Sequence, residues 1–147
     1  MKPPVVVVDT NVVIAGLISN EADSPVCRIL DGMLAGRFTY VLSDALLDEY
    51  RRVLLRDTIR KLHGLSMSQV DVILTAIVTN AVVREPKDLS HSAPDPGDDH
   101  LWHLLGETDG SILVTGNRKL IDNPPAFAAI VSPRSFVEAL DATSASK

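Results

Sequence analysis

The first residue that could do chemistry is Asp9, which directly follows four valines at residues 5–8. Consecutive β-branched residues predict a strand that is covered on both faces. A carboxylate at the end of such a strand is costly to bury unless it is hydrogen-bonded, paired with a cationic group or bound to a metal. Two interpretations stay open for Asp9 alone: it caps the helix that follows, or it belongs to a functional site.

Glu49 is the second acid that its position selects. It lies in SDALLDEYRRVL, residues 43–54, where an apolar stripe predicts one face of an amphipathic helix. At about 100° per residue, Glu49 falls on the edge of this stripe, whereas Asp48 and Arg52 are directed away from it. We therefore expect Glu49 to reach the edge of the sheet and Asp48 to face solvent.

Asp98 is the third acid. It lies in DPGDDHLWHLL, residues 95–105, where the same helical count puts Asp98 on the packed side of the first turn and directs Asp99 outward. Capping of the helix N-terminus is the alternative explanation for both residues. The sequence leaves open whether Asp95 or Asp99 also contributes to a site.

Three carboxylates brought together predict a metal site. Clustered carboxylates repel one another, so they are stable together mainly around a hard divalent cation, and oxygen ligands suit Mg²⁺ or Mn²⁺. Such ions, held by acids and a phosphate, are the usual means of phosphodiester hydrolysis. The polar turn VTGNRK, residues 114–119, adds Thr115 and Asn117, although a turn by itself explains Gly116 and Asn117.

The basic and histidine side chains indicate a function less specifically than the three acids do. Five cations follow Glu49 along one helical region and could guide an RNA backbone, although a solvated helix face or a surface for an acidic partner explains them equally well. They are Arg51, Arg52, Arg56, Arg60 and Lys61. The histidines His91, His100 and His103 have no cysteine nearby, so a zinc site is disfavoured.

Strands and helices alternate along the chain. We predict strands at residues 5–8, 38–42, 81–83, 111–115 and 128–132, and helices at 12–18, 25–34, 44–54, 66–78, from 98 onward, and 135–140. Asn11 and Ser24 are the predicted N-caps of the first two helices. This alternation predicts a three-layer α/β/α sandwich around a parallel sheet of four to five strands. In such sheets the functional crevice lies outside the carboxyl ends of the strands, where Asp9 stands.

Length and composition limit the number of domains, the kinds of partner and the location that we expect. With 147 residues and 46% hydrophobic side chains, the chain suits a single domain, predicted at residues 1–141, with a disordered tail at 142–147. The net charge of −5 argues against coating nucleic acid by bulk charge. The single cysteine, Cys27, cannot form an internal disulfide, and no stretch is apolar enough for a signal peptide or a membrane span. We therefore expect a cytoplasmic protein without a membrane partner.

Four ordered segments resemble the PIN-domain nucleases, and particularly the bacterial PIN proteins classed as toxin components of toxin–antitoxin systems. These segments are VVVVDTNVVIAGLIS, LSDALLDEYRRVL, DPGDDHLWHLL and SILVTGNRKLI. The resemblance implies an α/β/α sandwich, an acidic site that binds Mg²⁺ or Mn²⁺, and endonucleolytic cleavage of RNA. It also implies a homodimer and a cognate antitoxin whose segment occupies the groove near the acids.

The resemblance assigns roles to matching positions. Asp9 and Asp98 match acids that bind the metal, and Glu49 matches one that binds it or holds the attacking water. Asn11 and Thr115 match the polar positions beside them. Asn117 stands where many relatives have an aspartate, so the site has one charge fewer and a second metal would bind weakly. Thr115 and Asn117 are expected to position water or a phosphate oxygen.

Three other functions are alternatives to a metal-dependent nuclease. A phosphotransferase of the haloacid dehalogenase type needs a second aspartate two positions after Asp9, where this chain has Asn11. A P-loop enzyme needs a glycine-rich loop that ends in Gly-Lys-Ser/Thr, which is absent from the sequence. The strongest alternative is a PIN fold that binds RNA or a protein without cutting, because such a module does not need Asp9 and Asp98.

Overall fold

The structure is a computed structural model, and it describes residues 4–145. In this range the strands are β1 (Val6–Val8), β2 (Val41–Leu42), β3 (Val82–Val83), β4 (Ser111–Val114) and β5 (Ala128–Val131). The helices are α1 (Thr10–Ile18), α2 (Pro25–Leu34), α3 (Asp44–Leu54), α4 (Asp57–His63), α5 (Met67–Asn80), α6 (Asp99–Leu105), α7 (Arg118–Ile121) and α8 (Pro133–Ala145). A 3₁₀ turn, η1 (Pro96–Asp98), leads into α6.

The strands are parallel throughout but do not form the continuous sheet that was predicted. They form a three-stranded sheet in the order β1–β4–β5 and a two-stranded sheet of β2 and β3. A single bridge between Val6 and Tyr40 joins the two sheets. Beyond this bridge, the Val8 carbonyl of β1 accepts a hydrogen bond from the Tyr50 hydroxyl of α3.

The topology fixes where a site can form. With the bridge included, the strands lie in the order β3–β2–β1–β4–β5, so the chain runs outward from β1 to β3 and then crosses to β4 on the other side of β1. Ligands of open α/β sheets bind at such a switch, outside the carboxyl ends of the strands. Asp9 and Thr115 are the residues that directly follow β1 and β4, the two strands that meet at this switch.

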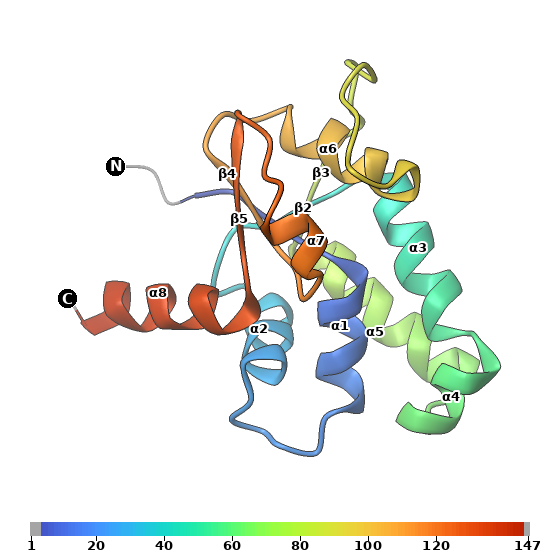
Figure 1. The fold of residues 1–147 in the computed structure, drawn as a ribbon. Helices are drawn as coiled ribbons and strands as arrows, with labels where there is room; N and C mark the ends of the chain where they lie inside the picture. The colour runs from blue at the N-terminus through green and yellow to red at the C-terminus, as the bar shows by residue number, and fades with distance from the viewer. Residues whose placement is uncertain (1–3, 146–147) are drawn as a thin grey trace.

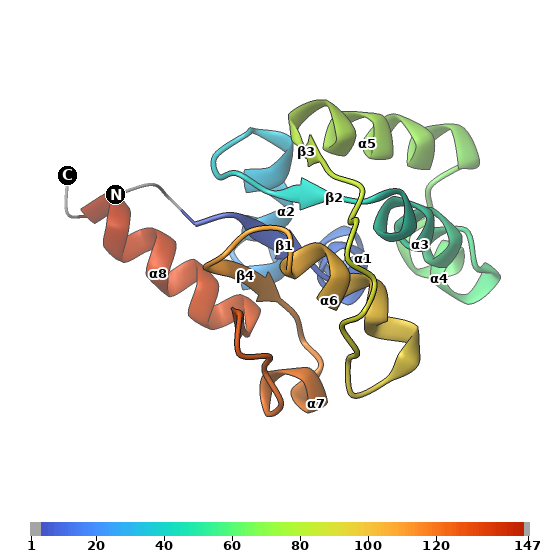
Figure 2. The same cartoon turned by 90° about the horizontal axis from the view of Figure 1, so that it is seen from above.

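Helices cover both sides of the strands. Figures 1 and 2 show α6 on one side, where it packs against β1 and β4, and α1, α2, α5 and α8 on the other. Within that second layer, α2 contacts α1, α5 and α8. The predicted α/β/α architecture is therefore confirmed.

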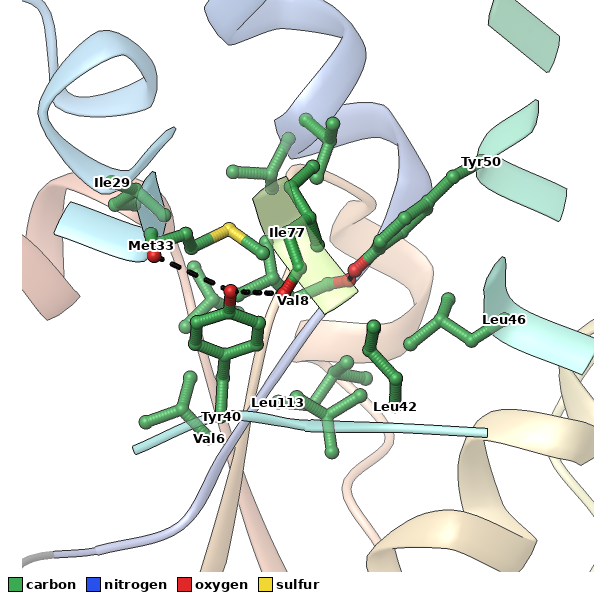
Figure 3. Packing of buried hydrophobic residues seen from close by; sticks show 14 of the residues in the cluster. Val6, Val8, Ile29, Met33, Tyr40, Leu42, Leu46, Tyr50, Ile77 and Leu113 are labelled. Carbon is green, nitrogen blue, oxygen red and sulfur yellow. Dashed lines mark hydrogen bonds between the residues drawn. The ribbon is translucent and has the colours of Figure 1, made fainter. Parts of the chain in front are cut away.

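Two buried tyrosines attach the helices to the strands (Figure 3). The Tyr40 hydroxyl donates to the carbonyl of Ile77 in α5 at 2.5 Å and lies 3.3 Å from the carbonyl of Met33 in α2. The Tyr50 hydroxyl of α3 donates to the Val8 carbonyl of β1. Both side chains are fully buried, so each hydroxyl needs such an acceptor. Tyr50 thereby holds α3 at the carboxyl end of β1.

The last helix is longer than the sequence predicted. It reaches Ala145, so residues 142–145, expected to belong to a disordered tail, are helical, and residues 146 and 147 lie outside the described part of the chain. Asp141 explains part of this extension, because its carboxylate accepts two hydrogen bonds from Arg28 of α2, at 2.5 and 3.1 Å. This pair fixes the second half of α8 against α2.

A turn at Gly64 separates α4, which was not predicted from the sequence, from α5, which was predicted at residues 66–78. Gly64 has φ 69°, a left-handed conformation that favours glycine, and it ends α4. Ser66 and Gln69 then form a capping box at the start of α5. Within residues 4–145 no single helix is long and apolar enough to cross a membrane; only α4 and α5 together pass that test, across a bend of 83°.

Candidate active site at the carboxyl ends of the strands

Asp9 caps the first helix and also lines a pocket. It is the N-cap of α1, and its Oδ1 accepts a hydrogen bond from the backbone N–H of Thr10 at 2.8 Å. Its Oδ2 accepts from the Thr115 hydroxyl at 2.8 Å and from the Asn11 amide at 3.1 Å. Only 5% of Asp9 is exposed, and burial raises the pKa of its carboxyl, although the hydrogen bonds from Thr115 and Thr10 oppose the rise.

The prediction that Asn11 caps the first helix is wrong, because Asp9 holds that position and α1 begins at Thr10. Asn11 instead links α1 to the turn after β4. Its amide Nδ2 lies 3.3 Å from the Thr115 hydroxyl, and its Oδ1 accepts from the backbone N–H of Gly116 at 3.0 Å. The polar residues at the ends of β1 and β4 thus form one hydrogen-bonded cluster.

Thr115 and Asn117 occupy different environments in this cluster. Thr115 is fully buried, and its hydroxyl donates to Asp9 and accepts from the backbone N–H of Asn117 at 3.0 Å. Thr115, which is expected to position water or a phosphate oxygen, thus has its hydroxyl bonded to Asp9 in this structure. Asn117 lines the pocket, but its Oδ1 accepts from the Lys119 backbone at 3.0 Å and caps α7.

Glu49 reaches the site from α3, next to Tyr50. Its Oε1 accepts a hydrogen bond from the Thr10 hydroxyl of α1, and its Oε2 lies 3.1 Å from Nε2 of His100 in α6. The hydrogen bond with His100 is the main reason why the pKa of Glu49 is lowered, and the Thr10 bond and the Arg52 charge act in the same direction. Three helices therefore converge on this one carboxylate.

Asp98 precedes α6 and is half-buried. No hydrogen bond from the helix N-terminus satisfies its carboxylate, so helix capping, the alternative explanation for this residue, does not account for it. Burial raises its pKa to about 6, and repulsion by Asp9, Asp95 and Glu49 adds to the rise. Asp98 is thus an acid close to other acids, and among residues 4–145 only the nearby His100 opposes the rise in its pKa.

Asp95 and Asp99, whose contribution the sequence left open, have structural contacts. The Asp95 carboxylate accepts from the backbone N–H of Gly97 at 2.9 Å and caps the 3₁₀ turn. Asp99 accepts from the backbone N–H of Ala93 at 2.8 Å and so holds the long loop before the turn. Neither residue lines the pocket that contains Asp9, Glu49 and Asp98.

All three selected acids line one pocket of about 750 Å³. Its opposite wall is mostly apolar and comes from α1, α2 and α3. That wall consists of Ile14, Ala15, Ile18, Val26 and Val53, with the cations Arg52 and Arg56 beside it. The pocket therefore joins an acidic end to an apolar end with a basic border.

The five basic residues separate into three groups. Arg52 and Arg56 line the pocket, and Arg52 lies 3.9 Å from Glu49 although the helical count directed it away. Arg51 faces elsewhere and pairs with Asp71 of α5 at 3.2 Å. Arg60 and Lys61 border a different hollow of about 380 Å³ on α4. Of the predicted RNA contacts, only Arg52 and Arg56 are placed to act at the acids.

Sequence reasoning missed two members of the site, Thr10 and His100. Both bind the Glu49 carboxylate, from α1 and α6 respectively. Neither contact has a signal in the sequence, because the spacing of two residues between Asp98 and His100 does not put two side chains on one face of a helix. His91 and His103 lie outside the pocket: Nε2 of His103 is 3.0 Å from the His91 carbonyl, and the His91 ring packs against Phe127.

The donor set suits a hard divalent cation. Among the residues that the structure describes, no three His, Cys, Asp or Glu side chains are gathered closely enough to form a ready-made metal site. However, three carboxylates share the pocket, and repulsion adds to burial in raising the pKa of Asp98. Added positive charge would relieve this repulsion, and carboxylate oxygens are the ligands that Mg²⁺ and Mn²⁺ prefer.

The fold is that of a PIN domain. The family model described as "PIN domain" matches residues 5–119, which include every residue of the site. The chain belongs to the PIN domain family, whose members are generally nucleases. Among solved structures, it is similar to the PIN domain of T. brucei RRP44, with a TM-score of 0.50 and 13% identity over 99% of this chain and 85% of that one. No curated protein gives a significant match.

Proposed function

We propose that this protein is a divalent-metal-dependent endoribonuclease that hydrolyses RNA phosphodiester bonds. The observation that carries the proposal is that Asp9, Glu49 and Asp98, from three distant segments of the chain, line one pocket at the switch point of the sheet. Burial, together with the charges of Asp9, Asp95 and Glu49, raises the pKa of Asp98. Such an arrangement is typical of functional sites, where pKa values are often perturbed.

Asp9 and Asp98 would hold Mg²⁺ or Mn²⁺, and Glu49 would bind the ion or hold the attacking water. When bound, the cation supplies an activated water and stabilises charge on the phosphate. The chain contributes orientation: Thr115 and Asn11 hold Asp9, and Asn117 offers its amide at the pocket wall.

RNA would reach the acids along the wall that carries Arg52 and Arg56. A nucleotide combines an apolar base with an anionic phosphate, and this half of the pocket combines an aliphatic surface with two guanidinium groups. Arginine is suited to both parts, because it binds phosphates and stacks on bases. The charge of −5 on the whole chain does not oppose this, since the contacts are local.

The Arg56→Ala variant should weaken RNA binding several-fold and lower the salt dependence of binding by about 0.7 in log Kd per log salt, the value for one phosphate contact on a single strand. Fluorescence anisotropy with labelled RNA in EDTA measures both quantities without cleavage. Arg51→Ala is the matched control, because Arg51 pairs with Asp71 outside the pocket. Equal losses in the two variants would remove Arg56 from the proposed RNA path.

Cleavage of a labelled, structured RNA by the purified protein tests the proposal directly. We expect internal cuts with Mg²⁺ or Mn²⁺ and none with EDTA. If metal binds to the protein but no RNA is cut under any condition, the non-catalytic alternative, a PIN fold that binds RNA or protein, replaces the nuclease.

The proposal extends to biological context through the resemblance of the quoted motifs. The protein would be the toxin of a toxin–antitoxin pair in the cytoplasm, acting as a homodimer. A segment of the cognate antitoxin would occupy the pocket beside Arg52 and Arg56 and so compete with RNA. The product of a neighbouring gene that suppresses cleavage would support this role.

A further inference from the structure

We propose that His100 is a positioning residue that holds Glu49 in its working orientation; this inference rests on the proposed function of the same site. Nε2 of His100 lies 3.1 Å from Oε2 of Glu49, and the two residues belong to α6 and α3. Each side chain is about one-fifth exposed, with 19% accessible. The contact is therefore partly shielded from water, and it joins elements that are 51 residues apart.

The surroundings of the imidazole determine which nitrogen carries the proton. Nδ1 of His100 is buried and has no hydrogen-bond partner among the described residues. A proton on Nδ1 would be a buried donor without an acceptor, which costs more than an unused acceptor. We therefore assign the proton to Nε2, which donates to Glu49. The ring is held in one tautomer by burial on one side and by a carboxylate on the other.

Glu49 needs such a partner more than the other acids do. Asp9 is short, caps α1 and receives three hydrogen bonds, so its orientation is already fixed. Glu49 has an additional rotatable bond and lies in the body of a helix, where no cap restrains it. Thr10 holds Oε1 and His100 holds Oε2, so the two oxygens are fixed from α1 and α6. His100 thus orients the carboxylate of Glu49 as Thr115 orients that of Asp9.

Asp98 and His100 also share one turn at the start of α6. A shift of this turn would move Asp98 and loosen Glu49 together, so the contact couples the second and third acids. Partners that orient the ligands of a metal typically affect metal affinity or activity by ~10–100-fold when they are removed. This range sets the expected effect of losing His100.

Three substitutions test the proposal. His100→Ala removes the donor, His100→Gln offers an amide N–H near the position of Nε2, and His100→Asn offers one near Nδ1, too short to reach Glu49. In single-turnover cleavage with saturating Mg²⁺, we expect His100→Ala and His100→Asn to reduce the rate ~10–100-fold with little change in KM for RNA. His100→Gln should recover most of the rate. Thermal unfolding of each variant checks that it is folded.

Two measurements do not depend on cleavage. Mn²⁺ binding, followed by electron paramagnetic resonance, should weaken in His100→Ala and recover in His100→Gln. Long-range ¹H–¹⁵N correlation spectra of the metal-free wild-type protein should show His100 protonated at Nε2. If wild-type protein cuts no RNA, the proposed function fails, and these two readouts still decide the role of His100.

Several outcomes would overturn the assignment. A proton on Nδ1, an unchanged rate in His100→Ala, or equal impairment of the Gln and Asn variants would each show that His100 does not position Glu49. A rise in KM without a change in rate would make His100 an RNA contact instead. Recovery by Gln alone, together with the Nε2 tautomer, is the result that a merely structural histidine would not give.

Discussion

Replacing Asp9 with asparagine should reduce metal-dependent RNA cleavage more than ~100-fold, because a direct metal ligand matters more than the partners that orient it. The substitution keeps the shape of the side chain and its acceptor for the Thr10 N–H, but it removes the charge that faces Asp98. Cleavage of labelled RNA with Mg²⁺, measured under single-turnover conditions, gives the rate.

The control for this prediction is Asp48→Asn. Asp48 lies on α3 one position before Glu49, but it is exposed and does not line the pocket. Its substitution removes the same charge from the chain and should leave the rate within about twofold of the parent. Cleavage by Asp9→Asn at the parental rate would assign the activity to another site or to a contaminant.

Replacing Asp98 with asparagine should make the metal-free protein more stable at neutral pH. The carboxyl of Asp98 has its pKa raised from 3.8 to about 6, mainly by burial and next by the negative charge of Asp9. At pH 7 the folded protein therefore carries a charge that its surroundings disfavour. After allowance for solvent screening of this half-buried group, we expect a gain on the order of 1 kcal/mol in the free energy of unfolding.

The gain should depend on pH in a defined direction. Because the pKa of Asp98 is higher in the folded than in the unfolded state, the folded protein binds the proton more tightly. The wild-type protein thus gains stability relative to Asp98→Asn as the pH falls from about 7 toward 4. Urea unfolding of both proteins in EDTA across this range gives the difference directly.

Bound Mg²⁺ should make the wild-type protein more stable than Asp98→Asn, the reverse of the order expected without metal. A ligand that binds only the folded state at 100 times its Kd stabilises it by about 2.7 kcal/mol. The wild-type protein should therefore gain stability from Mg²⁺, and Asp98→Asn should gain much less. A variant that is less stable than wild type in EDTA at pH 7, or equally stabilised by Mg²⁺, would contradict the assignment of Asp98 to a cation site.

Much of the acidic site could be predicted from local patterns. The valine run predicts a strand covered on both faces, and Asp9 directly follows it. The residue after such a strand lies at the functional edge of an α/β sheet. The apolar stripes of two helices then selected Glu49 over Asp48 and Asp98 over Asp99, and all three selected acids line the pocket. Helical periodicity was sufficient for Glu49 because the direction of its side chain is set within α3. Asp98 lines the pocket although it lies just before α6.

The partners of these acids could not be predicted in the same way. Thr10 and His100 bind Glu49 across 39 and 51 residues, and Arg52 joins the pocket because α1 lies opposite its helix. The hydroxyl of Tyr50 in α3 likewise bonds to the Val8 carbonyl of β1. Such contacts depend on how helices cross in space, and no sequence period encodes that.

The sequence by itself determined the α/β alternation, the three acids and the edge of the sheet at which they gather, because these follow from local periodicity and from strand polarity. Only the tertiary structure decided which carboxylates receive hydrogen bonds that offset the cost of burying their charge. Asp9 and Glu49 are hydrogen-bonded by residues from other elements, whereas Asp98 faces Asp9 and Glu49 with a raised pKa. Burial and charge repulsion act through space, so the electrostatic character of the site exists only once the chain is folded.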